Sequence, residues 1–118
     1  MNTIQLTEAI SAMIACALWS STDFDGNPLD SVGANVSQET LATLAADLRD
    51  FVEGNADDIA ASGLSPEQVG HDFWLTRNRH GAGFWDRGLG EIGERLTWQC
   101  RPFGSVDLYI GDDGRIHA

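Results

Sequence analysis

The chain has 118 residues, 42% of them hydrophobic and 21% charged, which suits one domain with a core and excludes two ordinary domains. Eighteen acidic residues face seven arginines and no lysine, giving a formal net charge of -11. This balance excludes an ordinary basic nucleic-acid-binding protein and disfavours anionic membranes, because few cationic side chains are available to meet phosphates.

The negative charge is concentrated in the first two thirds of the chain. Residues 1–76 contain twelve acidic residues and one arginine, whereas residues 77–118 contain six acidic residues and six arginines. We therefore expect a single domain, 1–118, with an acidic helical part at 1–76 and a charge-balanced helix plus hairpin at 77–118. Such asymmetry favours positively charged partners.

The first predicted element is a helix from Thr7 to Trp19, where apolar residues recur at helical spacing. The loop that follows, Ser20–Asn35, contains glycine and proline breakers and three carboxylates. Irregular loops of this length are more often functional or mobile than incidental.

A second helix is predicted to begin after Ser37, a suitable N-cap, and to be amphipathic. Gly54–Asn55 ends or kinks it, and a short continuation is closed by Gly63. If the helix continues past Gly54, four of its carboxylates lie near one line along the helix: Asp47, Asp50, Glu53 and Asp57.

A third helix is predicted to begin at Ser65, whose spacing to Gln68 is that of a capping box. After a polar, glycine-bearing loop, a fourth helix is predicted from Trp85 or Gly88 to Gln99, ended by Pro102.

Residues 105–118 alternate in polarity around a Gly111–Gly114 turn and predict a β-hairpin. The fold class is therefore α+β, with four or so helices packed with a C-terminal β-hairpin. We expect the core to contain the aromatic residues, including all four tryptophans: Trp19, Trp74, Trp85 and Trp98.

The sequence offers two metal-like patterns, and neither satisfies the requirements of a site. Asp23–Asn27 starts like a calcium-binding loop, but Pro28 stands where glycine is required and Ala34 where a bidentate glutamate belongs. An Asx-type turn is the alternative interpretation. His71, His80 and His117 have no metal-ligand spacing. We therefore predict no metal and no cofactor.

The group around the His80–Asp86 loop is the one cluster that resembles an active site: Arg77, Arg79, His80, Asp86 and Arg87. A histidine with a carboxylate and arginines could support general-base or phosphoryl chemistry. The structural interpretation, which we favour, is that the arginines pair with the acidic half and fix the loop, while Phe84 and Trp85 enter the core.

The remaining signal is the acidic surface itself. Carboxylates three residues apart on a helix are about 4.5 Å apart along its axis, close to the one charge per roughly 3.4 Å of a DNA strand. They could therefore imitate a phosphate track. The predicted partner-binding residues are Asp23, Asp25, Asp30, Glu39, Asp47, Asp50, Glu53, Asp57 and Asp58.

The segment His71–Gly88 reads HDFWLTRNRHGAGFWDRG, and further motif residues follow in Gly104–Tyr109 and Gly111–Gly114. This part of the chain resembles a group of small acidic proteins encoded by phages and mobile elements. In composition and size, the acidic first two thirds resembles anti-defence inhibitors, notably anti-CRISPR and antirestriction proteins that mimic DNA.

The resemblance and the charge together predict a non-enzymatic anti-CRISPR (type I) inhibitor without catalytic residues. Its carboxylates would occupy a basic DNA-binding surface of the surveillance complex, with Cas subunits as the partners. We expect no direct binding to nucleic acid or membranes, and a monomer or small homo-oligomer. The N-terminus lacks a basic signal region and the two cysteines form no framework, so we expect the host-cell cytoplasm.

Two other function classes remain open. The first is a small phage enzyme or accessory protein that uses Arg77, His80, Asp86 and Arg87. The second is a structural or regulatory module whose acidity only aids solubility.

Overall fold

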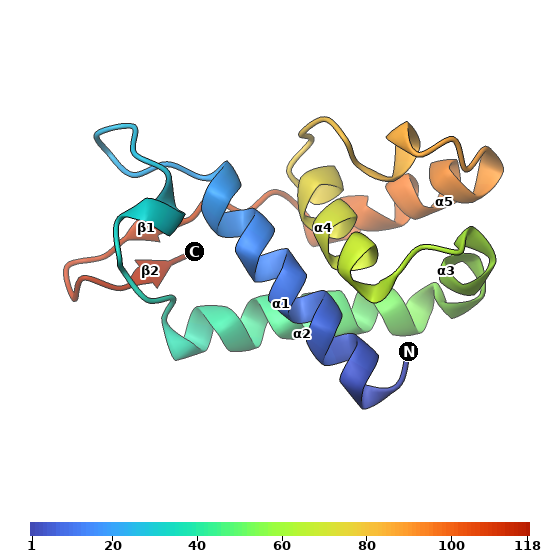
Figure 1. Cartoon of the computed structure of the whole chain (residues 1–118), viewed down its shortest axis with the longest axis horizontal. Coiled ribbons are helices and arrows are strands. Elements are labelled where there is room, and N and C mark those ends of the chain that lie inside the picture. The colour runs from blue at the N-terminus through green and yellow to red at the C-terminus, as the bar shows by residue number, and fades with distance from the viewer.

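The computed structural model describes residues 1–118 and contains five α-helices and a small C-terminal sheet (Figure 1). The fold class is α+β, as predicted, and its helical part has one helix more than the four expected. The helices are α1 (Thr3–Ser20), α2 (Gln38–Gly54), α3 (Ala56–Ser62), α4 (Pro66–Arg77) and α5 (Glu91–Cys100). The antiparallel strands are β1 (Tyr109–Ile110) and β2 (Ile116–His117), and the short 3-10 turns are η1 (Leu29–Ser31), η2 (Phe84–Asp86) and η3 (Arg101–Phe103).

Helix boundaries follow the capping residues. Ser37 and Ser65 cap α2 and α4 as predicted, and Ser65 forms the expected capping box with Gln68. Helix α1 begins four residues before the predicted start. The Asn2 side chain accepts a hydrogen bond from the Gln5 backbone N–H (2.8 Å), and the Gln5 side chain accepts one from the Asn2 N–H (3.0 Å).

The acidic helix does not continue past Gly54. Asn55 leaves helical geometry, with φ at -132°, and its side-chain amide donates to the carbonyl of Phe51 (2.9 Å). Helix α3 then starts as a separate element. The carboxylates of α2 and α3 therefore do not lie on one continuous helical line.

Helix α5 begins at Glu91, later than either predicted start. Gly88 and Gly90 have φ values of 67° and 62°, which are left-handed backbone conformations outside an α-helix. The preceding Phe84–Asp86 segment forms the short turn η2 instead.

The core lies where α1 crosses α2 and packs along α4 (Figure 1). The backbones of α1 and α4 approach closely at Gly70: a Cβ atom added there would meet the carbonyl oxygen of Ala9.

Helix α1 is long and apolar enough to cross a membrane, with a mean hydropathy of 1.2. Core helices of soluble proteins and signal sequences meet the same criterion. In this structure α1 contributes Ala9, Met13, Cys16 and Ala17 to the core.

We predict that Gly70→Ala destabilises the fold by about 1–3 kcal/mol or more, because the added methyl group must push the α1 and α4 backbones apart. Urea unfolding measures the change. Gly54→Ala is the matched control, since nothing lies within 4 Å of its added Cβ. That control is expected to be neutral or slightly stabilising. Equal stability of the two variants would show that the close approach is unimportant.

The prediction that all four tryptophans are core residues is wrong. Trp74 is buried, but Trp19, Trp85 and Trp98 are 52%, 45% and 63% exposed. Helix geometry explains Trp98, because Leu96 and Cys100 face the core and the residue midway between them points away. Its ring instead lies 4.1 Å from the Arg101 guanidinium. In η2, Phe84 takes the buried position and leaves Trp85 outside.

The hairpin is confirmed, although its strands are shorter than the alternating pattern suggests. Val106 lies outside β1 because its N–H bonds to the Asn78 side chain (2.8 Å). Strand β2 is flanked on its other edge by the segment before α2. The Ile116 N–H donates to the Asn35 carbonyl (2.8 Å), and the Ile116 carbonyl accepts from Ser37 (2.9 Å).

Candidate functional site

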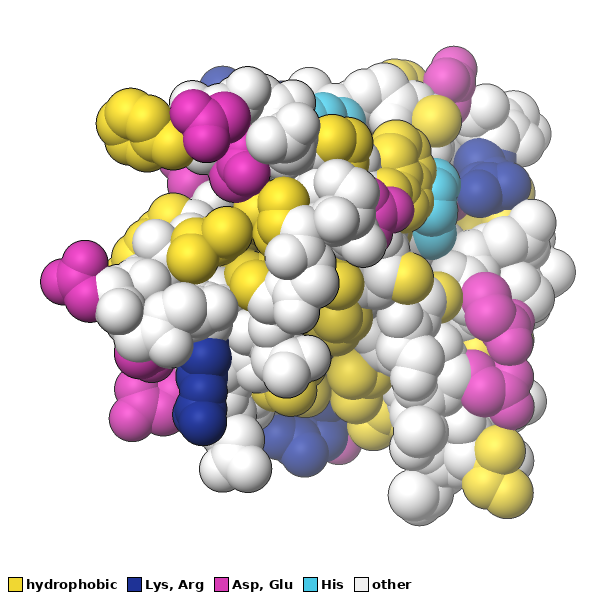
Figure 2. All heavy atoms as spheres, turned by 60° about the vertical axis from the view of Figure 1, so that its left-hand side comes forward, with side chains coloured by type: hydrophobic (Ala, Val, Ile, Leu, Met, Phe, Trp, Pro, Cys, Tyr) yellow, Lys and Arg dark blue, Asp and Glu magenta, His cyan; other side chains and the backbone are white.

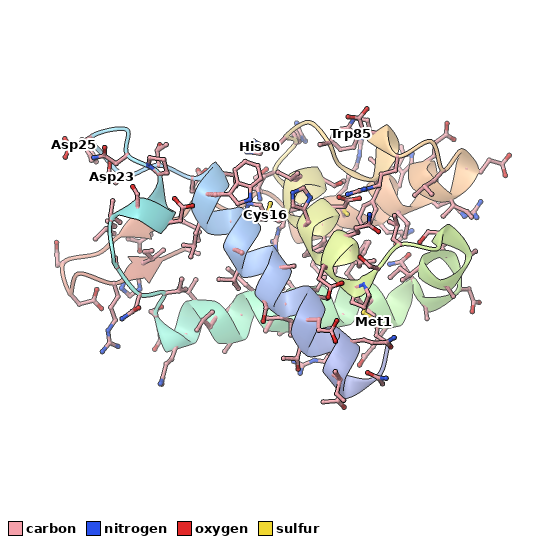
Figure 3. The ribbon with its side chains drawn as sticks, in the orientation of Figure 1. Met1, Cys16, Asp23, Asp25, His80 and Trp85 are labelled. Carbon is pink, nitrogen blue, oxygen red and sulfur yellow. The ribbon has the colours of Figure 1, made fainter.

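The nine predicted partner-binding carboxylates do not form one surface. Asp23 and Asp25 lie in the loop at one end of the molecule, whereas α3 lies at the opposite end of a body 42 Å long (Figures 1 and 3). Two of the nine form ion pairs with arginines of the same chain. Asp47 accepts a hydrogen bond from Arg77 (2.9 Å), and Asp58 accepts two from Arg95 (2.8 and 2.9 Å).

Four exposed carboxylates without an ion pair lie along α2 and α3, and we call them the acidic ridge: Glu39, Asp50, Glu53 and Asp57. Asp50 and Glu53 are one turn apart near the end of α2. Asp57 follows just beyond the Gly54–Asn55 break. Glu39 lies at the other end of α2, roughly 16 Å away along the axis.

The break between α2 and α3 makes the surface concave at the end of the acidic ridge where three of its four carboxylates lie. Residues Glu53–Asp58 line a shallow hollow of about 380 Å³. Because α2 stops at Gly54, the carboxylates of Glu53 and Asp57 border a concave surface rather than a straight track. Asp58, on the same hollow, is held by Arg95.

The loop carboxylates have a structural explanation of their own. The Asp23 side chain accepts hydrogen bonds from the backbone N–H groups of Asp25 (2.9 Å) and Asn27 (2.8 Å), which confirms the Asx-type turn. The bond from Asn27 is the main cause that lowers the pKa of Asp23. Asp25 and Asp30 are exposed.

The residues of the enzyme-like cluster are not brought together. Arg77 is buried against Asp47, and Arg87 binds Asp72 (2.6 and 2.9 Å). His80 and Asp86 are exposed, and no hydrogen bond or ion pair joins either side chain to another residue of the cluster. The prediction that arginines pair with the acidic half is confirmed for Arg77 and Arg87. Arg79 forms no ion pair.

Asp72 is fully buried on α4 and has a structural role that the sequence patterns do not predict. Its carboxylate accepts two hydrogen bonds from Arg87 and lies 3.2 Å from Nδ1 of His71. The bond to Asp72 raises the pKa of Arg87. The position of Asp72 between the apolar residues Val69 and Phe73 could have indicated a buried ion pair. Aspartates are seldom buried without a partner.

Neither cysteine is placed for reactivity. Burial raises the pKa of both thiols, Cys16 and Cys100, to about 12, so they remain protonated at neutral pH. No three residues among the histidines, cysteines, aspartates and glutamates converge as metal ligands.

Comparison of the chain with protein-family models, curated proteins and solved structures gives no match. The resemblance of His71–Gly88 to small phage proteins therefore remains a prediction from sequence.

Proposed function

We propose that this protein is a non-enzymatic inhibitor that binds, through its acidic ridge, a basic DNA-binding surface of another protein. The partner we propose is a type I CRISPR surveillance complex in the host-cell cytoplasm, following the resemblance in size and acidity to anti-CRISPR proteins. The carboxylates would occupy the positions that DNA phosphates take against arginine and lysine.

The observation that carries the proposal is the unpaired group of carboxylates at the α2–α3 junction. Asp50, Glu53 and Asp57 are exposed, and none has an ion pair. Asp50 and Glu53 are about 4.5 Å apart along the axis, comparable with the phosphate spacing of roughly 3.4 Å on one DNA strand. A surface of one charge sign also steers a basic partner over long distances.

The internal ion pairs support the same proposal. Arg77, Arg87 and Arg95 are engaged with aspartates of residues 1–76. Their charges are therefore offset within the fold rather than presented at the acidic ridge. Arg49 is the one exposed base on α2.

Charge reversal of the acidic ridge tests the proposal. The variant Asp50→Lys/Glu53→Lys/Asp57→Lys should inhibit target-DNA binding by the type I complex about 100-fold less well, because juxtaposed like charges cost several kcal/mol. Asp47 is left unchanged, since it holds Arg77. Inhibition is measured as the protein concentration that halves DNA binding by the complex.

The matched control is Asp86→Lys/Asp107→Lys/Asp112→Lys, which changes net charge equally at exposed positions outside α2 and α3. It should retain most of the inhibition. Arg49→Glu should inhibit more strongly than the unaltered protein. Equal loss in both triple variants would show that net charge, and not the acidic ridge, is responsible.

A further inference from the structure

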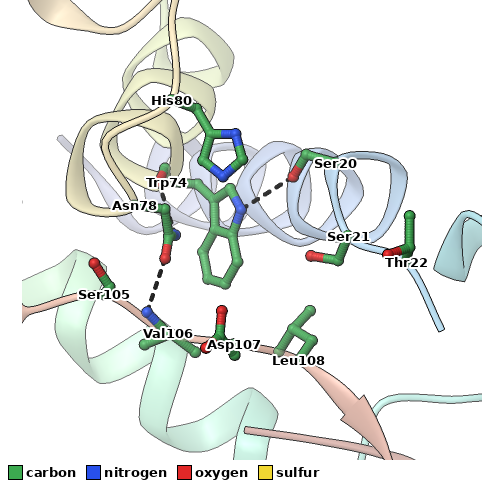
Figure 4. Close-up of a pocket in the computed structure, with 10 residues that line it drawn as sticks. All are labelled: Ser20, Ser21, Thr22, Trp74, Asn78, His80, Ser105, Val106, Asp107 and Leu108. Carbon is green, nitrogen blue, oxygen red and sulfur yellow. Dashed lines mark hydrogen bonds between the residues drawn. The ribbon is translucent and has the colours of Figure 1, made fainter. Parts of the chain in front are cut away.

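Two adjoining hollows separate the loop after α1 from the segment that leads into β1. One is about 490 Å³ and is lined by Ser20–Thr22 on one side and Ser105–Leu108 on another, with Trp74, Asn78 and His80 between them (Figure 4). The second is about 410 Å³ and is lined by Thr22–Asp25 and Leu108–Ile110. The two hollows adjoin at Thr22 and Leu108, which line both, and together we call them the groove.

One wall of this groove is the unpaired edge of β1. The backbone groups of Ile116 on β2 bond to Asn35 and Ser37, on the side away from β1. Ile110, which faces Ile116 in the register, is therefore in a non-hydrogen-bonded pair, and its N–H and carbonyl point outward. No hydrogen bond within the chain reaches the backbone of Asp107, Leu108 or Ile110.

The opposite wall has an unpaired backbone as well. Thr22 pairs with Pro28 between two flanking hydrogen bonds, from Leu29 to Ser21 (2.9 Å) and from Asp23 to Asn27 (2.8 Å). The N–H and carbonyl of Thr22 therefore point away from Pro28, and they have no partner within the chain. An extended segment in the groove would find free backbone groups on both walls.

The side chains around the groove indicate what kind of segment fits. Apart from His80, its charged lining residues are all carboxylates: Asp23, Asp25 and Asp107. Phe24 is fully exposed, and Tyr109 and Ile110 are exposed beside it. Figure 2, which brings this end of the molecule forward, shows acidic and apolar side chains next to one another. Aromatic and apolar anchors of this kind mark binding sites.

We propose that this groove binds an extended segment of a partner protein, rich in arginine or lysine alternating with apolar residues, by β-strand addition. The backbone of the segment pairs with the edge at Leu108–Ile110, its cations meet the aspartates, and its apolar side chains contact Phe24 and Tyr109. This site is separate from the acidic ridge and goes beyond the function proposed above, because it recognises peptide backbone rather than imitating DNA.

The test uses the full chain and a fluorescent peptide, Arg-Val-Arg-Val-Arg-Val, with binding followed by anisotropy. A peptide of the same sequence, N-methylated at the valines, keeps its charge but loses backbone donors. We expect it to bind about tenfold more weakly or worse, because each methylated valine can no longer donate a backbone hydrogen bond to the groove. Equal binding of the two peptides would overturn the proposal, because charge alone would then explain it.

Variants of the protein give a second, independent readout. Ile110→Pro removes an outward N–H that has no partner, and proline is tolerated at such edge positions. It should weaken peptide binding, whereas Ile110→Ala, which keeps the N–H, should weaken it less. The acidic-ridge triple variant should bind the peptide as the unaltered protein does. Loss of peptide binding in that variant would place the contact on the ridge and contradict the groove.

Discussion

Replacing Arg77 with methionine is expected to destabilise the protein by about 3–5 kcal/mol, the range for breaking a buried charged pair. The side chain is 1% exposed. It donates to Asp47 (2.9 Å) and to the carbonyls of Phe103 (2.8 Å) and Gly104 (2.9 Å). The guanidinium also lies over the rings of Phe73 and Phe103.

The destabilisation caused by Arg77→Met should extend beyond α4, because Arg77 joins three parts of the chain. Asp47 belongs to α2, while Phe103 and Gly104 begin the segment that leads to β1. We therefore expect Arg77→Met to increase hydrogen exchange at Val106 and in β1 as well as lowering the urea midpoint. Lysine at this position cannot reproduce the planar fork and should recover only part of the stability.

Asp47→Asn is the matched control for this prediction. The carboxylate of Asp47 is 29% exposed, so water can replace part of the interaction. The asparagine oxygen can still accept from Arg77 and the two carbonyl bonds remain, but the buried guanidinium loses its counter-charge, so we expect a loss of about 1–3 kcal/mol, smaller than that of Arg77→Met. If Arg77→Met were no more destabilising than Asp47→Asn, Arg77 would not hold these segments together.

The second large effect is expected at Asp72 and Arg87. Arg87→Met should destabilise the protein by about 3 kcal/mol, the lower end of the range for a broken buried pair, because Arg87 is partly exposed while Asp72 is fully buried. In this variant, the remaining side-chain partner of the Asp72 carboxylate is His71, whose Nδ1 lies 3.2 Å away. Urea unfolding of the variant measures the loss.

A double-mutant cycle separates the pair from its surroundings. Arg87→Met leaves the buried carboxylate of Asp72 without its arginine. Asp72→Asn removes that charge. The double variant should therefore be more stable than the sum of the single effects implies, by about 1–3 kcal/mol of coupling. Additive losses would mean that the two side chains act separately and that the 2.6 Å bond contributes little.

The sequence predicts the local features of this fold well. Ser37, Ser65 and Gly63 mark helix ends through bonds to residues three or four positions away, which a local pattern contains. Helix α1 starts earlier than predicted because the Asn2–Gln5 capping box sets its first turn. Helix α5 starts later than predicted because Gly88 and Gly90 adopt positive φ values, which do not belong to an α-helix.

The candidate site was harder to predict, because it depends on long-range pairing. Asp47 has the spacing of an exposed acidic face, but Arg77, thirty residues later, binds it. Asp58 is similarly held by Arg95. The free backbone groups of Ile110 follow from the register, in which Ile110 faces Ile116 in a non-hydrogen-bonded pair and β1 has no neighbour on its other side. None of these contacts is visible in local spacing.

Direct competition with DNA is the measurement that tests the central claim most directly. A type I surveillance complex is titrated with the protein at increasing concentrations of unlabelled target DNA, and the apparent Kd of the protein is recorded. If the acidic ridge occupies the DNA-binding surface, the apparent Kd rises in proportion to the DNA concentration, and no complex holds both ligands. An apparent Kd that stays constant, or a ternary complex with DNA and protein bound together, would contradict the account.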